Sequence, residues 1–232
     1  MRIYFILFLL IYFLNTFCSH AQGCKTDSPT VSTITALKET IRKDASKNLV
    51  DLKKLIPGLL IEMPYATPNN FTKATLYKNP IAILRTEPAY ALKQVQEELS
   101  RKGLAIKLFD AFRPFSVTCR MWRLVPDRRY AANPRNGSNH NRGVAVDLTI
   151  INLKTRKELD MGTPFDNFTD TAHHDFYNLP PEVIANRRLL KTVMIKYGFN
   201  IVPTEWWHYQ WLHRAGYEII DLDFADIRSI LQ

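Results

Sequence analysis

The chain has 232 residues, 46% of them hydrophobic, and its 31 lysines and arginines against 22 acids give a formal charge of +9. That length and apolar content suit one domain with a sizeable core, and the sequence contains no internal repeat or low-complexity tract. The charge could favour loose association with anionic wall polymers or a membrane surface. Basic and aromatic residues are not interleaved as in nucleic-acid-binding proteins, so we expect no nucleic-acid partner.

Residues 1–21 are typical of an export signal. Arg2 precedes a continuous apolar run over residues 3–14, and Ser19-His20-Ala21 has small residues at both positions that a signal peptidase reads. The run is too short to span a bilayer comfortably, which takes roughly 20 apolar residues. We therefore expect an exported protein, periplasmic or secreted. A lipoprotein anchored at Cys24 is the alternative, although the residues before it lack the usual large aliphatic side chain.

The mature chain divides into a polar lead-in, residues 22–48, and a domain over residues 49–232. The lead-in is expected to be flexible apart from one helical stretch through Leu37 and Ile41. The three cysteines do not form a disulfide framework, because Cys18 leaves with the signal. Cys24 and Cys119 could pair or stay free, or Cys24 could carry lipid.

The first half of the domain alternates short elements with turns. Residues 49–63 form its first ordered element, interrupted by a turn at Pro57-Gly58. A helix follows, with Thr86 as its N-cap, Pro88 in its first turn and Gly103 just past its end. Apolar residues at the core-facing positions of that helix are Leu92, Val95 and Leu99.

A strand and a shorter helix come next. Leu104, Ile106 and Leu108 alternate with other residues as a strand does, and the strand delivers Asp110 and Arg113 at its end. The helix is expected from Pro114 towards Trp122.

The second half contains a core strand, a helix and a closing strand pair. Residues 144–151 are β-branched and apolar, which predicts a strand buried on both faces. An amphipathic helix over residues 181–197 ends before Gly198, with Ile184, Leu189, Val193 and Met194 on its core side. Strands near residues 199–202 and 207–211 complete an α+β domain, with helices against one antiparallel or mixed sheet.

Polar residues near these strands have the composition of a metal site. Asp147 lies within the core strand, where an unpaired carboxylate would be costly, so it needs a cationic partner. Gly143 lets the incoming loop turn, so that His140 can reach the face that carries Asp147. Glu205 and His208 are three residues apart, which would place them on opposite faces of a regular strand. We therefore expect Glu205 on a loop or bulge, with the strand proper starting near Trp207 and carrying His208 inward.

His140, Asp147 and His208 are thus predicted to be three ligands of one zinc ion, with a fourth position left for water. An open position is typical of catalytic rather than structural zinc. Histidine and carboxylate ligands also accept other divalent metals. His173, His174 and His213 lie in polar stretches and are expected to be structural or solvent-facing.

Several motifs together resemble a known family. S-x-H-x-x-G-x-A-x-D at residues 138–147, followed by E-W-W-H at residues 205–208, is similar to the zinc D-alanyl-D-alanine peptidases, most closely the VanX-type dipeptidases. MPYATPNNF, FDAFRP and MGTPFD occur in the order that family shows, and the resemblance covers residues 49–211. It implies a fold of the D-Ala-D-Ala peptidase and hedgehog type. The stretch between Arg113 and His140 is shorter here than in the resistance-type enzymes.

The predicted chemistry assigns two catalytic residues. Glu205, near the metal but not bound to it, would take a proton from the attacking water and pass it to the leaving amine. Arg113 would stabilise the oxyanion beside the metal, and the resemblance implies the same role. Arg113 could instead only brace Asp110, and Glu205 could be an ordinary surface acid.

The resemblance also places Tyr65, Ser138 and Asp166 in a dipeptide pocket. Asp166 could hold a free ammonium, while the two hydroxyls could bind the other end or the backbone of the substrate. Tyr65 could instead only pack, and Asp166 could cap a turn before Asn167.

The leading hypothesis is an exported zinc dipeptidase that hydrolyses D-alanyl-D-alanine or a close relative in cell-wall metabolism. A carboxypeptidase that trims the terminal D-alanine of peptidoglycan stems is the alternative. A non-catalytic zinc module that binds the wall is more remote, because it would have little reason to keep both Glu205 and Arg113.

Overall fold

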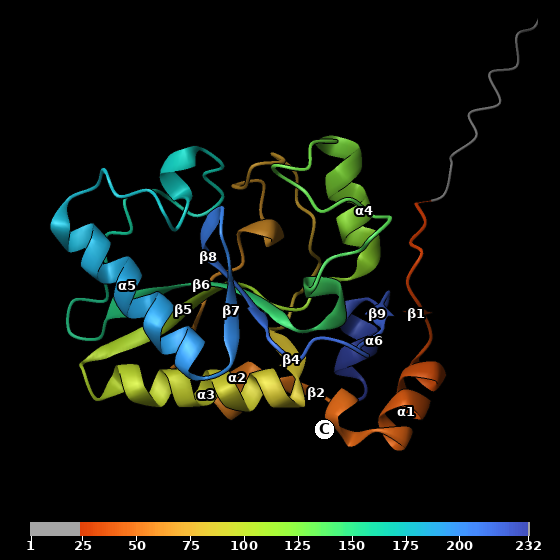
Figure 1. The fold of residues 1–232 in the computed structure, drawn as a ribbon. Coiled ribbons are helices and arrows are strands. Elements are labelled where there is room, and N and C mark those ends of the chain that lie inside the picture. Colours follow the sequence, from red (N-terminus) through yellow and green to blue (C-terminus); the bar gives the residue numbers. More distant parts are fainter. Residues whose placement is uncertain (1–23, 232) are drawn as a thin grey trace, which may run out of the picture.

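The structure, a computed structural model, describes residues 24–231, and the expected export signal lies outside this range. A five-stranded sheet at its centre has the strand order β3-β5-β6-β8-β7 (Figure 1). The strands are β3 (Leu60–Ile61), β5 (Leu104–Asp110), β6 (Ala145–Asn152), β7 (Phe199–Val202) and β8 (Glu205–Trp211). Because β3 is parallel to β5 and the other pairs are antiparallel, the sheet is mixed, and the predicted α+β class is confirmed.

Helices and two small sheets surround the central sheet. The helices are α1 (Ile34–Lys43), α2 (Leu52–Leu55), α3 (Thr86–Ser100), α4 (Phe115–Leu124), α5 (Pro181–Lys196) and α6 (Phe224–Arg228). Strand β1 (Thr30–Val31) pairs in parallel with β9 (Ile219–Ile220), and β2 (Leu49–Asp51) pairs antiparallel with β4 (Ile83–Arg85). In Figure 1, α3 runs along the lower side of the central sheet, and α5 packs against both α3 and β7.

The register of the central sheet lines up polar residues on three neighbouring strands. Asp147 of β6 pairs with Asp110 of β5 on one side and with His208 of β8 on the other. Directly opposed residues project to the same face of a sheet. A register shift after Leu108 brings Asp110 opposite Asp147. Strand β6 is buried from residue 145 to residue 151, so these groups meet in an apolar interior.

The strand that carries His208 is irregular near Glu205, where the sequence predicts a loop or bulge. Strand β8 begins at Glu205, two residues before the predicted start near Trp207. A register shift separates the Ile201–Tyr209 pair from the Val202–Glu205 pair. Such an irregularity changes the side-chain alternation along β8. The expected bulge is therefore present, but it lies within the strand rather than before it.

Helix α3 begins one residue earlier than the capping pattern predicts. Thr86 is the first helical residue and Arg85 holds the N-cap position, with no side-chain capping bond. The Thr86 hydroxyl instead donates to the carbonyl oxygens of Ala45 and Asn48, each at 3.4 Å. A contact with a segment distant in sequence has replaced the local cap.

Helix α5 buries a slightly different face from the one predicted. Its buried residues are Val183, Arg187, Leu190, Val193 and Met194, whereas Ile184 and Leu189 are only half-buried. The Arg187 guanidinium donates to the carbonyl oxygens of Met161, Thr171 and His173 at 2.7, 2.9 and 3.1 Å. These hydrogen bonds allow the Arg187 guanidinium to be buried. The spacing of apolar residues along the helix does not predict its burial.

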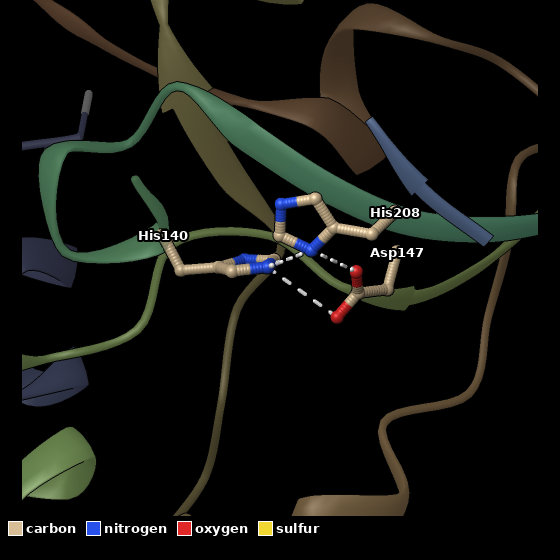
Figure 2. A group of neighbouring side chains, drawn as sticks. All are labelled: His140, Asp147 and His208. Atoms are coloured by element: carbon tan, nitrogen blue, oxygen red, sulfur yellow. Dashed lines mark hydrogen bonds and ion pairs between the residues drawn. The ribbon is translucent and has the colours of Figure 1, made fainter. Parts of the chain in front are cut away.

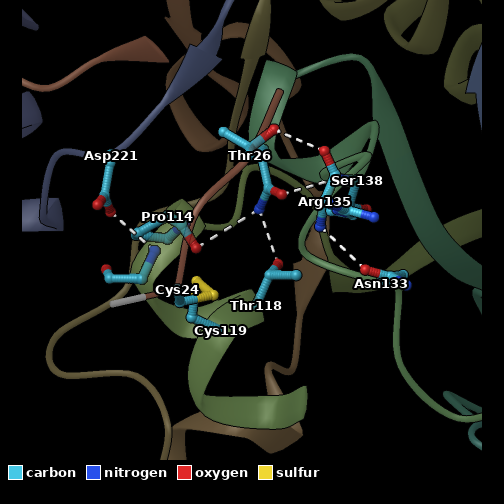
Figure 3. Close-up of a disulfide and its surroundings, with 11 residues drawn as sticks. Cys24, Thr26, Pro114, Thr118, Cys119, Asn133, Arg135, Ser138 and Asp221 are labelled. Atoms are coloured by element: carbon cyan, nitrogen blue, oxygen red, sulfur yellow. Dashed lines mark hydrogen bonds between the residues drawn. A yellow bond between two sulfur atoms is a disulfide. The ribbon is translucent and has the colours of Figure 1, made fainter. Parts of the chain in front are cut away.

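The lead-in is anchored rather than flexible at its described start. A disulfide joins Cys24 to Cys119 of α4, across a sequence separation of 95 residues (Figure 3). The pairing of β1 with β9 fixes the chain again at residues 30–31. Of the alternatives left open for Cys24 and Cys119, the structure shows the disulfide. Within residues 24–231, no helix has the length and apolar character needed to cross a membrane.

The disulfide is expected to contribute measurably to stability, because it closes a long loop in the unfolded chain. A Cys24→Ser/Cys119→Ser double variant should lose about 2–4 kcal/mol of unfolding free energy. Urea titration followed by tryptophan fluorescence measures the loss. A thiol reductant should weaken the wild-type protein by a similar amount and leave the double variant unaffected. Equal stability of the reduced and oxidised wild-type protein would contradict this account.

Candidate functional site

Two imidazoles and a carboxylate converge on one point beside the central sheet. His140 comes from the 3-10 turn His140–Arg142, Asp147 from β6 and His208 from β8 (Figure 2). His140 Nε2 lies 3.3 Å from His208 Nδ1 and 3.4 Å from Asp147 Oδ2, and His208 Nδ1 lies 2.9 Å from Asp147 Oδ1. Bonds of 2.0–2.2 Å at tetrahedral angles hold ligand atoms about 3.3–3.6 Å apart. The cluster therefore has nearly the spacing of three ligands around one tetrahedral ion.

Neighbouring groups orient the ligand atoms. Gly143 has a left-handed φ of +70° at the end of the turn, which returns the chain towards β6. His140 Nδ1 lies 2.6 Å from the carbonyl oxygen of Ala111. A proton on Nδ1 would satisfy that contact and leave the Nε2 lone pair directed at the cluster, an arrangement typical of metal-bound histidine.

The electrostatics of Asp147 also fit a bound cation. Its side chain is almost fully buried, and the nearest polar group to Oδ1 is His208 Nδ1 at 2.9 Å. Burial by itself would raise the pKa of Asp147, but His140 and His208 outweigh it and hold this pKa well below the ordinary value. A buried, ionised carboxylate that faces two imidazole nitrogens matches the ligand chemistry of a divalent metal.

Arg113 is braced by Asp110 and also reaches the cluster. Its Nε and Nη2 donate to Asp110 Oδ2 at 3.0 and 2.7 Å, and Tyr77 donates to Asp110 Oδ1 at 2.7 Å. Arg113 Nη2 lies 4.0 Å from Asp147 Oδ2. The bracing interaction that the sequence left as an alternative is thus present, and it fixes the guanidinium beside the cluster. The role of Tyr77 was missed, because nothing in the sequence links it to Asp110.

Tyr65 and Asp166 form a second polar pair at the cavity. The Tyr65 hydroxyl donates to Asp166 Oδ1 at 3.0 Å, while Asp166 Oδ2 is buried without a donor in the described chain. Burial, followed by the charge of Asp147, raises the pKa of Asp166 well above its usual range. The turn at this point is instead supported by Asn167, whose Oδ1 accepts from Thr169. Asp166 is therefore directed at Tyr65 and the cavity rather than capping that turn.

Glu205 lies beside the cluster as a separate acid. Its Oε2 is 3.6 Å from His208 Nδ1, outside bonding distance, and its side chain is 23% exposed. Burial raises the pKa of Glu205 above the ordinary value. A carboxylate with raised pKa next to a metal cluster is well suited to accept a proton.

One cavity of about 270 Å³ contains all eight residues singled out in the sequence: Tyr65, Arg113, Ser138, His140, Asp147, Asp166, Glu205 and His208. The structure brings them together, while their roles stay predictions. Ser138 Oγ accepts from the His140 amide at 3.2 Å, which leaves its own proton for a ligand. Sequence reasoning missed other residues of the wall, which include Arg128, Arg129, Tyr130 and Phe168.

Comparison with known proteins identifies a family. Residues 45–227 match the D-Ala-D-Ala dipeptidase family. A D-alanyl-D-alanine dipeptidase from Escherichia coli (strain K12) is 33% identical over 76% of this chain and 91% of its own. The chain belongs to the D-Ala-D-Ala dipeptidase family.

Other relatives extend the comparison. A D-alanyl-D-alanine dipeptidase from Enterococcus faecium is 29% identical over 68% of this chain and 88% of its own. A solved LD-carboxypeptidase, LdcB, is a more distant match, with 17% identity and a TM-score of 0.42 over 79% of this chain and 78% of its own.

The cluster predicts stoichiometric metal binding that depends on its histidines. After dialysis against a divalent metal and then buffer, the wild-type protein should retain about one ion per chain. His208→Ala should retain almost none, because two ligands hold an ion far less tightly than three. His213→Ala, which alters an exposed histidine outside the cluster, should match the wild type. Elemental analysis gives the metal content, and full occupancy in His208→Ala would refute the assignment.

Proposed function

We propose that the protein is a zinc-dependent dipeptidase that hydrolyses D-alanyl-D-alanine or a close D,D-dipeptide. The observation that carries the proposal is the convergence of His140, Asp147 and His208 beside Glu205, in a cavity that also contains Arg113. Family membership supplies the substrate class, because its curated relatives are D-alanyl-D-alanine dipeptidases.

The donor set supports zinc at the cluster. Two imidazole nitrogens and one carboxylate oxygen are ligands that catalytic zinc takes, with the remaining position open. When bound, zinc would polarise the scissile carbonyl group and lower the pKa of the attacking water. His140, Asp147 and His208 would hold it, and the Ala111 carbonyl would fix the ring of His140.

Glu205 would move the proton that hydrolysis requires. One water adds across the peptide C–N bond: its oxygen joins the carbonyl carbon, and the bond to nitrogen breaks. Glu205 would accept a proton from that water and deliver it to the leaving amine, so that two D-alanine molecules form. The raised pKa of the Glu205 carboxyl favours its acting as both base and acid.

Arg113 would stabilise the negative charge that develops on the carbonyl oxygen. Its guanidinium is held in place by two bonds to Asp110 and lies on the cavity wall. A fixed cation in a buried site needs little rearrangement as the charge forms, which is the condition for effective oxyanion stabilisation.

Asp166 and Tyr65 would select the amino end of the substrate. The unsatisfied Asp166 Oδ2 offers an acceptor to an ammonium group, and Tyr65 holds the other carboxyl oxygen. The positive charge of an ammonium group would also offset the repulsion between Asp166 and Asp147, which together with burial raises the pKa of Asp166. Ser138 would donate its hydroxyl to another part of the dipeptide.

We further propose that the protein is exported. Residues 1–21 have the pattern of a signal, and the Cys24–Cys119 disulfide is of a kind that persists in oxidising compartments. A Cys24 sulfur bonded to Cys119 has no valence left for a lipid, which favours a periplasmic or secreted protein over a lipoprotein.

The proposal predicts metal-dependent release of D-alanine from the free dipeptide. The zinc-loaded protein should hydrolyse D-alanyl-D-alanine, a chelator should abolish the activity, and added zinc should restore it. A stem pentapeptide should be a much poorer substrate, because an acylated nitrogen cannot give Asp166 a charged partner. Faster cleavage of the pentapeptide would favour the carboxypeptidase alternative, and no D-alanine from either substrate would refute the hydrolase.

The role of Glu205 is separable from metal binding. Glu205→Gln should keep about one zinc per chain yet lose about 10²- to 10⁴-fold in kcat, the usual contribution of a general acid–base. Glu182→Gln, on an exposed part of α5, is the matched control and should keep wild-type turnover. Unchanged kcat in the metal-loaded Glu205→Gln protein would remove this residue from the mechanism.

A further inference from the structure

The rim of the cavity carries two adjacent arginines that the proposed chemistry does not use. Arg128 and Arg129 lie in the loop of residues 125–137, between α4 and the turn that carries His140, and both line the cavity. The side chains of this loop can therefore contact a substrate bound in the cavity.

Aromatic contacts hold the loop against the cavity. The Tyr130 ring lies 4.8 Å from that of Phe168, edge to face, and is stacked 6.5 Å from that of Phe71. Phe168 in turn contacts Trp207 of β8, with ring centroids 6.0 Å apart. The backbone next to Arg128 and Arg129 is thus fixed to the same wall that carries the metal cluster.

The far end of the loop is held by the lead-in. The carbonyl oxygen of Arg135 accepts from the Asp27 amide at 3.0 Å and from the Thr26 hydroxyl at 3.1 Å. Figure 3 shows this segment passing from the Cys24–Cys119 disulfide across α4 towards Ser138. With both ends held, the loop presents its arginines at a defined place.

The cationic side chains of the cavity differ in whether their charge is already compensated. Arg113 is paired with Asp110, and Arg129 makes a two-pronged pair with Asp127, with Nη2 at 2.6 Å and Nε at 3.1 Å from Oδ2. Within residues 24–231, the Arg128 guanidinium has neither an ion pair nor a hydrogen bond. Its five donors remain available to a ligand.

A free dipeptide carries a carboxylate that needs such a partner. The cavity already contains the acidic side chains of Asp147, Asp166 and Glu205, of which the ionised Asp147 would repel a further negative charge. Asp166 is suited to the ammonium end of the substrate, so the carboxylate must lie elsewhere in the cavity. A guanidinium binds a carboxylate through two parallel hydrogen bonds, and Arg128 is the described cation whose charge is uncompensated.

We infer that Arg128 binds the terminal carboxylate of the substrate and makes the site selective for peptides with a free carboxyl end. The inference rests on the proposed function, since it concerns a substrate of that reaction. Arg128 is then a specificity-determining residue at the rim. Arg128 would contact the carboxylate of the bound substrate and not the peptide bond that is hydrolysed.

The test compares D-alanyl-D-alanine with D-alanyl-D-alaninamide, which has the same scissile bond and no carboxylate. D-Alanine release gives kcat and KM for both substrates with the zinc-loaded wild-type protein and with Arg128→Gln and Arg128→Lys. Arg123→Gln, which removes an exposed arginine of α4 outside the cavity, is the control for net charge. Thermal unfolding and zinc content of each variant verify that fold and metal site are intact.

The wild-type protein should prefer the dipeptide over the amide by about tenfold in kcat/KM, the effect of one charge-assisted pair at an exposed position. Arg128→Gln should lose most of that preference, chiefly through a higher KM for the dipeptide and with kcat little changed. Arg128→Lys should keep part of the preference, and Arg123→Gln all of it.

A wild-type preference that survives in Arg128→Gln would overturn the inference and leave the proposed function standing. An equal loss of activity on both substrates would also overturn it, because that pattern marks a structural role for the loop. A zinc-loaded wild-type protein that releases D-alanine from neither substrate would instead refute the proposed function, and the inference with it.

Discussion

A carboxylate buried between two imidazoles is the constraint on which the rest of the structure depends. Asp147 lies within an apolar, buried strand, where an ionised carboxylate is costly. The charge is tolerable only if a cation sits against it, and His140 and His208 place their ring nitrogens where a shared ion would be bound. Burying Asp147 therefore lowers the stability of the metal-free fold, and a bound metal ion would offset that loss, which is also the source of the affinity of the site for metal.

Irregularities in the sheet make this convergence possible. A regular strand would send Glu205 and His208 to opposite faces, and the shift in the β7–β8 register removes that conflict. A second shift in β5 brings Asp110 opposite Asp147, which places the brace of Arg113 next to the cluster. Two register shifts in the central sheet thus shape the edge of the cavity, and both lie next to the proposed metal site.

Much of the site could be predicted because its residues stand out in short stretches of the sequence. A carboxylate inside an apolar run, a glycine after a histidine and the Glu205–His208 spacing each indicate a polar function at an otherwise apolar place. The fold class and the family followed from element order and from motifs, and both are confirmed.

What could not be predicted depends on contacts between distant segments. The burial of Arg187 requires three carbonyl groups from other parts of the chain, and Thr86 bonds residues about forty positions earlier rather than capping its own helix. Likewise, the pairing of Cys24 with Cys119 follows from how the lead-in crosses α4, which no spacing rule fixes. The rim arginines stayed hidden for the same reason, because only the folded loop shows which of them is already paired.

The most direct test of the central claim is a crystal structure of the zinc-loaded protein with anomalous diffraction data at the zinc edge. The account predicts the strongest anomalous peak between His140 Nε2, His208 Nδ1 and the Asp147 carboxylate, about 2.0–2.2 Å from each, with Glu205 beyond bonding distance. A principal zinc peak elsewhere in the chain, or one bound directly by Glu205, would contradict it.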